Sequence, residues 1–243
     1  AMQKGGIHVE NEEELAGLSE AYIRSIKSED GNGWYMPLIN TTQQPNLASL
    51  ENRETREKLF KASYMRADGS EFDTNDVIKR IAQVRAEKAA LLGFNNYAEW
   101  KLQNTMAKGP EGVRKFFDSF IDASVAKADA EAKKIQAFMN ESGQEGTLEP
   151  WDWDFYAEKV RKAEYDLDES QIKPYFQVEA VMEDGVFYAA EKLFGITYKK
   201  RDDIPVYHED VVVYELFEED GSELGLFYAD FFARPSKRGG AWM

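Results

Sequence analysis

The stretch VFYAAEKLFGITYKKR, residues 186–201, divides the sequence into two kinds of secondary structure. From Val186 to Phe194 the apolar residues recur with helical spacing, and Gly195 follows where a helix commonly ends in a left-handed residue. After Gly195 the residues become β-branched, aromatic and basic, a composition typical of strands. The pattern predicts helices before residue 195 and strands after it.

The strand side contains one hairpin. The segments ITYKKR, VVVYELFE and SELGLFYADFFA are rich in β-branched and aromatic residues, and residues 218–221 (EEDG) between the last two form a turn signal. We therefore expect two regions: a helical region over residues 1–195 and a small antiparallel sheet region over residues 196–243.

The helical side is predicted from caps and apolar stripes. GWYMPLI (33–39) is expected to be extended. Helices are expected over residues 11–28, 49–65, 75–92, 97–102 and 110–140, and again from Pro150 after a loop at 141–150. The helices at 75–92 and 97–102 are predicted to form a hairpin, with an apolar stripe turned inward: Ile78, Ile81, Val84, Ala89 and Leu92. The predicted fold class is mainly α, an array of amphipathic helices followed by a small antiparallel sheet.

The amino-acid composition and net charge of the chain disfavour some classes of binding partner. The chain has 243 residues, of which 43% are hydrophobic, so it can bury one large core or two modest ones. Its 45 acidic and 30 basic residues leave a net charge of −15, which disfavours nucleic acid and anionic membranes. The densest basic run, residues 199–201, is followed at once by Asp202 and Asp203, so no basic patch offsets that charge.

Cysteine is absent, which excludes disulfides, thiolate metal sites and a cysteine nucleophile. No apolar run approaches the length of a membrane span, and the first residues lack the core of a signal peptide. We expect a cytoplasmic protein, or one whose targeting signal has been removed.

Two histidines limit the catalytic possibilities. His208 is followed by Glu209, but Val212 occupies the place where an H-E-x-x-H zinc helix needs its second histidine, and His8 fails in the same way. A Ser-His-Asp triad is not excluded, although no G-x-S-x-G elbow is present and a structural role is the commoner one for such a histidine. We assign no catalytic and no metal-binding residue in this chain.

The aromatic segment at 151–156 is interpreted as structural. Asp152 and Asp154, two residues apart, would point to different sides of a helix, so we interpret them as cap and surface residues rather than a glycosidase pair. Core and helix-entry packing is the expected role of the neighbouring aromatic residues: Trp151, Trp153, Phe155 and Tyr156.

The last strand carries the one candidate binding surface. Gly225 inside the strand, Arg234 after it, and then Gly239, Gly240 and Ala241 could present bare backbone and positive charge to an extended peptide. The alternative is that Gly239 and Gly240 only turn the chain towards its next element.

Seven stretches, in order, resemble one family of proteins. Together they are similar to the thimet oligopeptidase and peptidyl-dipeptidase Dcp family of zinc metallopeptidases, and most of all to its bacterial Dcp branch. The stretches are NRETREKLF (52–60), IAQVRAEKAALLGFNNYAEW (81–100), MAKGPEGV (106–113), LEPWDWDFYAEKVRK (148–162), IKPYFQVEAVMEDGVFYAAEKLFGI (172–196), VYHEDVVVYEL (206–216) and LFYADFFARPSKRGGAWM (226–243).

The resemblance implies an α-rich, two-lobed protein with a deep channel that cleaves short peptides with a single zinc, its Dcp members releasing C-terminal dipeptides. In that family the zinc ligands, an H-E-x-x-H helix and a later glutamate, follow the GGAW segment. The printed sequence ends at Met243 before any such motif, so no catalytic or metal residue is carried over to this chain.

We therefore expect a fragment of a zinc-dependent oligopeptidase that is inactive alone, with zinc in the parent enzyme and short peptides as its substrates. Self-association through an apolar face left uncovered by the cut is a further expectation. The alternative is a non-catalytic helical module that binds extended peptides on its terminal hairpin.

Overall fold

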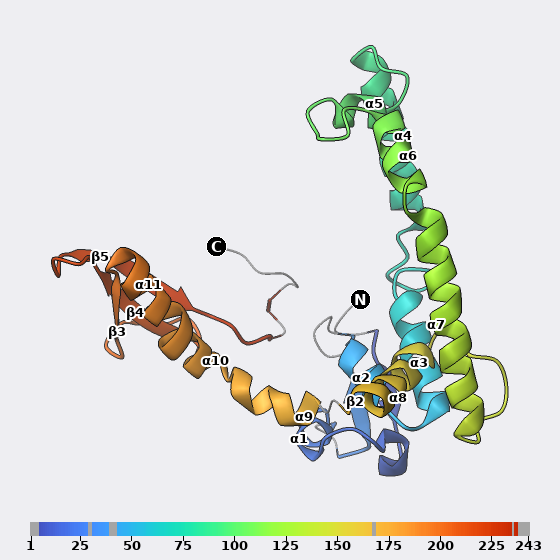
Figure 1. Cartoon of the computed structure of the whole chain (residues 1–243), viewed down its shortest axis with the longest axis horizontal. Coiled ribbons are helices and arrows are strands. Elements are labelled where there is room, and N and C mark those ends of the chain that lie inside the picture. The colour runs from blue at the N-terminus through green and yellow to red at the C-terminus, as the bar shows by residue number, and fades with distance from the viewer. Residues whose placement is uncertain (1–4, 29–30, 39–42, 167–168, 235, 238–243) are drawn as a thin grey trace. The chain divides into compact units, whose positions relative to one another are not determined.

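The computed structural model describes residues 5–28, 31–38, 43–166, 169–234 and 236–237. The chain divides into two compact units, Ala1–Glu164 and Tyr165–Met243. Most of the described chain is helical, and two small antiparallel sheets complete it, which confirms the predicted class (Figure 1). The division into a helical region at 1–195 and a sheet region at 196–243 remains a prediction.

Unit 1 begins with a two-stranded sheet. Strand β1 (Ile7–Val9) pairs antiparallel with β2 (Trp34–Met36), which confirms the extended segment expected there, although β1 itself was not predicted. Between the strands lie a 3-10 turn, η1 (Glu12–Leu15), and helix α1 (Glu20–Ser25). The prediction of a single helix over residues 11–28 was therefore wrong.

The break in that predicted helix has a steric cause at Gly17. Its φ is +89°, and a Cβ atom there would lie 2.0 Å from the carbonyl oxygen of Ser49. The neighbouring carbonyl of Ala16 accepts a hydrogen bond of 2.8 Å from the Glu51 amide. The chain therefore leaves the helix at this point to meet a segment distant in the sequence, a contact that local propensity does not encode.

Helix α2 (Gln43–Ser49) is followed by α3 (Arg53–Tyr64), so Ser49 ends one helix and does not begin the next. The N-cap of α3 is Asn52, whose side-chain oxygen accepts from the amide of Thr55 at 2.9 Å. The start predicted at Ser49 was wrong. Serine and asparagine are both good N-caps, but it is Asn52, and not Ser49, that directly precedes the first turn of α3. The core of this part combines the sheet with α2 and α3: Val9, Leu15, Ile26, Met36, Leu38, Leu47 and Leu59.

Helices α4 (Asn75–Leu91) and α5 (Tyr97–Leu102) confirm the predicted hairpin. The Lys88 ammonium lies 4.2 Å from the centre of the Trp100 ring, and the Arg85 guanidinium lies 5.1 Å from that of Tyr97. Of the stripe predicted to point inward, only Ala89 is buried. The others are exposed, so that prediction was wrong for them: Ile78 60%, Ile81 44%, Val84 43% and Leu92 49%.

The predicted helix at 110–140 is two helices, α6 (Pro110–Asp118) and α7 (Ile121–Glu141). At the break, the Ser119 hydroxyl donates to the Phe116 carbonyl at 2.6 Å, and the amides of Ser119 and Phe120 bond three residues back. When a serine hydroxyl donates a hydrogen bond to a carbonyl oxygen of the preceding turn, it competes with the backbone amides for that oxygen. The last turn becomes tighter, and the α-helix ends there.

Helix α8 (Trp153–Tyr165) follows the loop predicted after α7 and begins three residues later than Pro150. It packs against α7 through a second core: Ile135, Met139, Phe155, Tyr156 and Val160. Those contacts confirm core packing for Phe155 and Tyr156.

Unit 2 starts with short helical segments: α9 (Glu169–Ile172), η2 (Lys173–Phe176), α10 (Val178–Ala180) and the π-helix η3 (Val181–Phe187). These lead into α11 (Tyr188–Phe194), which Gly195 ends with a φ of +73°, as predicted. A Cβ atom at Gly195 would lie 2.7 Å from Cβ of Glu219, so any other residue would be strained here.

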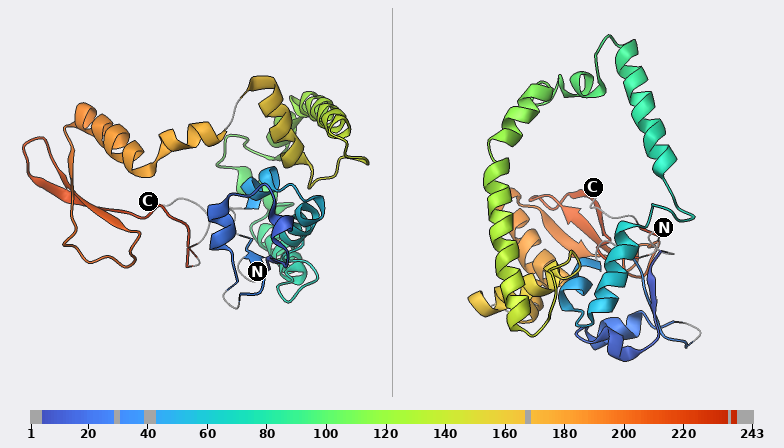
Figure 2. Two further views of the ribbon diagram at one scale, coloured as in Figure 1. Left: turned by 90° about the horizontal axis from the view of Figure 1, so that it is seen from below. Right: turned by 90° about the vertical axis from the view of Figure 1, so that its right-hand side faces the viewer.

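The second sheet has the order β3-β4-β5, all antiparallel, with β3 at Thr197–Lys200, β4 at Val212–Phe217 and β5 at Glu223–Ala229. The predicted turn at 218–221 joins the last two strands. The helix formed by η3 and α11 runs along the sheet (Figure 2). Phe187 stacks on Tyr198 at 3.9 Å between ring centres and meets Tyr214 edge-on at 4.8 Å, so these rings join helix and sheet.

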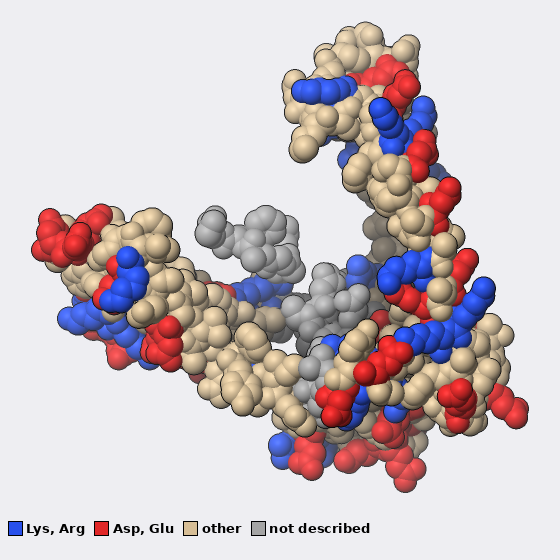
Figure 3. Space-filling view, viewed as in Figure 1, with Lys and Arg blue, Asp and Glu red and all other residues tan. Residues whose placement is uncertain are grey.

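The surface carries charges of both signs. On the face shown in Figure 3, Lys and Arg alternate with Asp and Glu along the helices of unit 1. Among the helices that the structure describes, none combines the length and the apolar composition that crossing a membrane requires.

Candidate functional site

Strand β5 is an edge of the three-stranded sheet. It pairs with β4 on one side, where Gly225 lies opposite Leu216 next to an irregularity in the register. A Cβ atom added at Gly225 would meet nothing within 4 Å, so the glycine leaves open space on the strand. Three large side chains of β5 are also exposed: Leu224 47%, Leu226 48% and Tyr228 40%. In the part of the chain that the structure describes, no strand pairs with the other side of β5, and an edge of this kind can pair with an added extended chain.

The segment after β5 is held by one carboxylate, that of Asp230. Its two oxygens accept from both terminal nitrogens of Arg234 at 2.7 Å, and one of them pairs with the Lys237 ammonium at 2.7 Å. The Tyr207 hydroxyl donates to the same group at 3.0 Å. The Arg234 guanidinium, and after it Lys237, hold the pKa of Asp230 well below its usual range.

This cluster changes the interpretation of Arg234. The sequence offered Arg234 as a free positive charge for a peptide, but its guanidinium is paired with Asp230 and lies 5.7 Å from the centre of the Tyr207 ring. An acid does stand four residues before Arg234, but residues 230–234 form no helix, so the helical i,i+4 rule could not have indicated this pair. Gly225 lies on the open edge, whereas Gly239, Gly240 and Ala241 fall outside the described residues.

A metal site needs a group of ligands, and in the part of the chain that the structure describes no three His, Asp or Glu side chains are grouped to hold an ion. His8 lies 4.8 Å from Tyr35 between ring centres. The Nδ1 atom of His208 accepts from the Asp210 amide at 3.2 Å, just before β4. The contact of His8 lies across the β1-β2 pair and that of His208 lies within its own turn, and zinc ligation does not fit the donors described here.

Sequence reasoning misjudged Asp152. It is not a surface residue but is fully buried, and it accepts hydrogen bonds from Arg53 (2.7 and 3.1 Å) and Arg56 (3.0 Å) of α3. Burial alone would raise the pKa of its carboxyl, but the hydrogen bonds from Arg53 and Arg56 outweigh burial and lower it. Arg56 is itself 1% exposed, and its guanidinium lies 4.0 Å from the centre of the Phe155 ring. The segment before α8 is thereby fixed to α3 by a buried ion-pair network.

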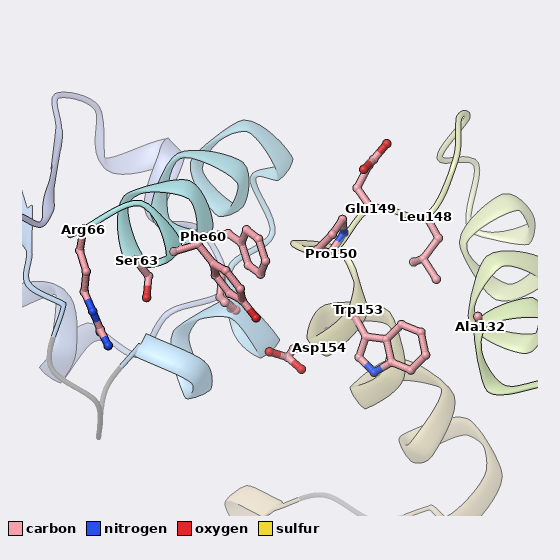
Figure 4. Close-up of a pocket in the computed structure, with 11 residues that line it drawn as sticks. Phe60, Ser63, Arg66, Ala132, Leu148, Glu149, Pro150, Trp153 and Asp154 are labelled. Atoms are coloured by element: carbon pink, nitrogen blue, oxygen red, sulfur yellow. The ribbon is translucent and has the colours of Figure 1, made fainter. Parts of the chain in front are cut away.

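A pocket of about 710 Å³ opens in unit 1 beside that network. Figure 4 shows its walls: α3 on one side, the start of α8 and the preceding loop on the other, with Ala132 of α7 at one end. Its lining is mainly apolar and aromatic, with one basic and two acidic side chains: Leu47, Phe60, Ser63, Tyr64, Arg66, Ala132, Leu148, Glu149, Pro150, Trp153 and Asp154. Such a size and lining suit a small organic ligand.

Comparison with known proteins places the chain among peptidases. A family model described as peptidase family M3 matches residues 46–243. Dipeptidyl carboxypeptidase of Escherichia coli (strain K12) is 47% identical over 249 residues, which covers 100% of this chain and 37% of that protein. Oligopeptidase A of the same strain is 32% identical (97% of this chain, 36% of that protein), and the probable thimet oligopeptidase of Arabidopsis thaliana is 26% identical (93% and 31%). The chain therefore spans about a third of the length of these relatives.

Proposed function

The chain belongs to peptidase family M3, and on this premise we propose that it is part of a zinc-dependent peptidase that hydrolyses short peptides. The observation that carries the proposal is the 47% identity to a dipeptidyl carboxypeptidase along the whole of this chain. That similarity favours the release of C-terminal dipeptides, the activity that the name of this relative indicates.

The contribution of this chain would be a binding wall. An extended peptide would pair with the free edge of β5 at Gly225, because backbone hydrogen bonds from an edge strand bind a peptide with little dependence on its side chains. Arg234 would act from its pair with Asp230, in the segment that follows that edge.

Zinc would be bound by residues other than those described here, since these offer no ligand set. When bound in such a peptidase, zinc polarises the scissile carbonyl and acidifies a water molecule. We therefore expect the isolated chain neither to bind zinc stoichiometrically nor to cleave peptides, and we expect its role to be in holding the substrate.

The test compares the 243-residue chain with a longer product of the same gene. We expect chelator-sensitive release of dipeptides only from the longer protein, whose sequence should contain H-E-x-x-H beyond residue 243. Stoichiometric zinc or chelator-sensitive turnover in the shorter chain would contradict the assignment. A gene without the zinc motif would remove the peptidase proposal altogether.

A second candidate is a non-catalytic module that binds extended peptides. The open edge of β5, together with the exposed Leu224 and Leu226, favours it. Saturable binding of a peptide by a complete gene product that lacks H-E-x-x-H would select this candidate. Alanine substitution at Arg234 and Gly225 that left peptide binding unchanged would argue against both versions of the site.

Exposed apolar side chains also support self-association of this chain in isolation. On α4, Val77, Ile78 and Ile81 are 56%, 60% and 44% exposed, although contiguous apolar surface on a soluble monomer is normally limited. Sedimentation velocity over a range of concentrations would detect the association, and a concentration-independent monomer would refute it.

A further inference from the structure

The pocket of about 710 Å³ beside the Asp152 network contains a carboxylate, that of Asp154, which no described residue pairs with. Asp154, in the first turn of α8, is half-buried, and burial raises the pKa of its carboxyl. Within the ranges that the structure describes, no hydrogen bond or ion pair reaches this carboxylate. Asp152, only two residues earlier, is completely paired with Arg53 and Arg56.

An unpaired, partly desolvated carboxylate costs stability. A charged group that leaves water without a partner loses hydration that nothing in the protein replaces. An asparagine would fill the same space without that cost. The carboxylate therefore suits a ligand more than it suits the fold, in keeping with the observation that local costs of this kind concentrate at binding sites.

The surroundings of Asp154 select the charge of that ligand. Figure 4 shows Asp154 between the α3 side chains and the indole of Trp153. Phe60 and Tyr64, stacked at 4.3 Å between ring centres, form the α3 wall, and Tyr64 is 74% exposed and therefore free to contact a ligand. Aromatic faces attract cations, and a carboxylate in the same pocket gives such a cation its counter-charge.

The other charges in the lining agree with a cationic ligand. Glu149 adds a second negative charge, while Arg66 lies at the end of the pocket opposite Leu148 and Ala132 (Figure 4). Two carboxylates against one guanidinium leave the pocket net negative, which disfavours phosphates and carboxylates. A metal ion is also disfavoured, because no three ligating side chains are grouped among the residues described.

We propose that this pocket binds an organic cation, a primary ammonium or guanidinium on an apolar stem, with the Asp154 carboxylate as its counter-charge. The stem would lie against the aromatic walls and the charged head would donate to Asp154. Both a basic peptide side chain and a free alkylamine have this chemistry. The site lies in unit 1 and does not depend on the proposed hydrolysis.

The test is calorimetric titration of the complete 243-residue chain with matched probes. The probes are N-acetyl-lysine amide, its uncharged analogue N-acetyl-norleucine amide, and butylamine as a free amine. We expect lysine amide to bind at least about tenfold more tightly than norleucine amide, since a charge-assisted hydrogen bond is worth that much. Binding of butylamine as tight as that of lysine amide would assign the site to free amines, and weaker binding would assign it to peptide side chains.

Asp154→Asn is the decisive variant. It should weaken binding of lysine amide about tenfold and leave binding of norleucine amide unchanged, while the protein folds at least as stably as before because an unpaired charge has been removed. Tyr64→Leu should also weaken binding of the cation, because this change removes an exposed aromatic side chain from the pocket wall and leaves the buried core unchanged. Asp118→Asn, the same change at an exposed position of α6, is the matched control and should have no effect.

Two results would overturn the proposal. Equal affinity for the lysine and norleucine probes would show an apolar pocket that does not use the carboxylate. Absence of saturable binding of either cation at millimolar concentration would show that the pocket is not a cation site.

Discussion

Replacement of Asp152 by asparagine is expected to destabilise unit 1 more than any other single charge change in it. Asp152 is fully buried and compensates two guanidinium groups, of which that of Arg56 is 1% exposed and that of Arg53 30%. The substituted side chain would keep one acceptor oxygen but no charge, so the Arg56 charge would be buried without compensation. Breaking a buried pair in this way costs about 3–5 kcal/mol.

The guanidinium of Arg53 is partly exposed, so water can hydrate its charge after the substitution and lower the loss of stability. The guanidinium of Arg56 is buried and cannot be hydrated in this way. Two of the Arg56 hydrogen bonds would survive, to the carbonyl oxygens of Leu50 (2.8 Å) and Glu51 (2.9 Å), but its Nε atom already has no partner among the described residues. For a unit of this size roughly 2–4 °C of melting temperature corresponds to each kcal/mol, so we expect a decrease of about 6–20 °C.

The assay is urea unfolding followed by circular dichroism, with Glu158→Gln as the control. Glu158 pairs with Arg161 on α8 at 2.6 Å, and because both side chains are about one third exposed, loss of this pair should cost about 1 kcal/mol or less. If Asp152→Asn cost no more than the Glu158→Gln control, the buried network would contribute nothing and the argument would be refuted.

The dependence on pH supplies an independent check. The folded pKa of Asp152 lies below its unfolded value of about 3.9, so the stability it contributes is present above that value and is lost as the pH falls through the folded pKa. The difference between the wild type and Asp152→Asn should therefore shrink in acid. A difference that stayed constant below about pH 4 would contradict this assignment.

Three further outcomes are expected. Gly195→Ala should cost about 1–2 kcal/mol in urea unfolding because of its positive φ, whereas Gly185→Ala, inside a helix with open space around it, should be neutral or stabilising; equal effects would refute the steric account. Asp230→Asn should lower the pKa of Tyr207, which the hydrogen bond to Asp230 raises, as an absorbance titration would report. Asp154→Asn should increase stability more at about pH 7 than at about pH 3, because a raised folded pKa lowers stability as the carboxyl ionises; a constant difference between the two pH values would contradict it.

Local signals determined much of the secondary structure. Gly195 ends a helix, residues 218–221 turn a hairpin and Pro110 opens a helix, because the interactions responsible lie within a few residues of each signal. The family was likewise determined by sequence alone, through seven short stretches in a fixed order, and the family match over residues 46–243 confirms it.

Distant contacts decided what the sequence left open. Gly17 breaks a predicted helix because the chain meets Ser49 there, and Asp152 is buried because arginines 96 and 99 residues away in the sequence pair with it. That no described residue pairs with Asp154, two positions further on, is also a tertiary property. Composition and spacing describe Asp152 and Asp154 in the same way. The packing of α3 against the start of α8 makes Asp152 a structural counter-ion and leaves Asp154 facing a pocket. Burial and pairing depend on neighbours that the local sequence does not contain, and only the tertiary structure supplies them.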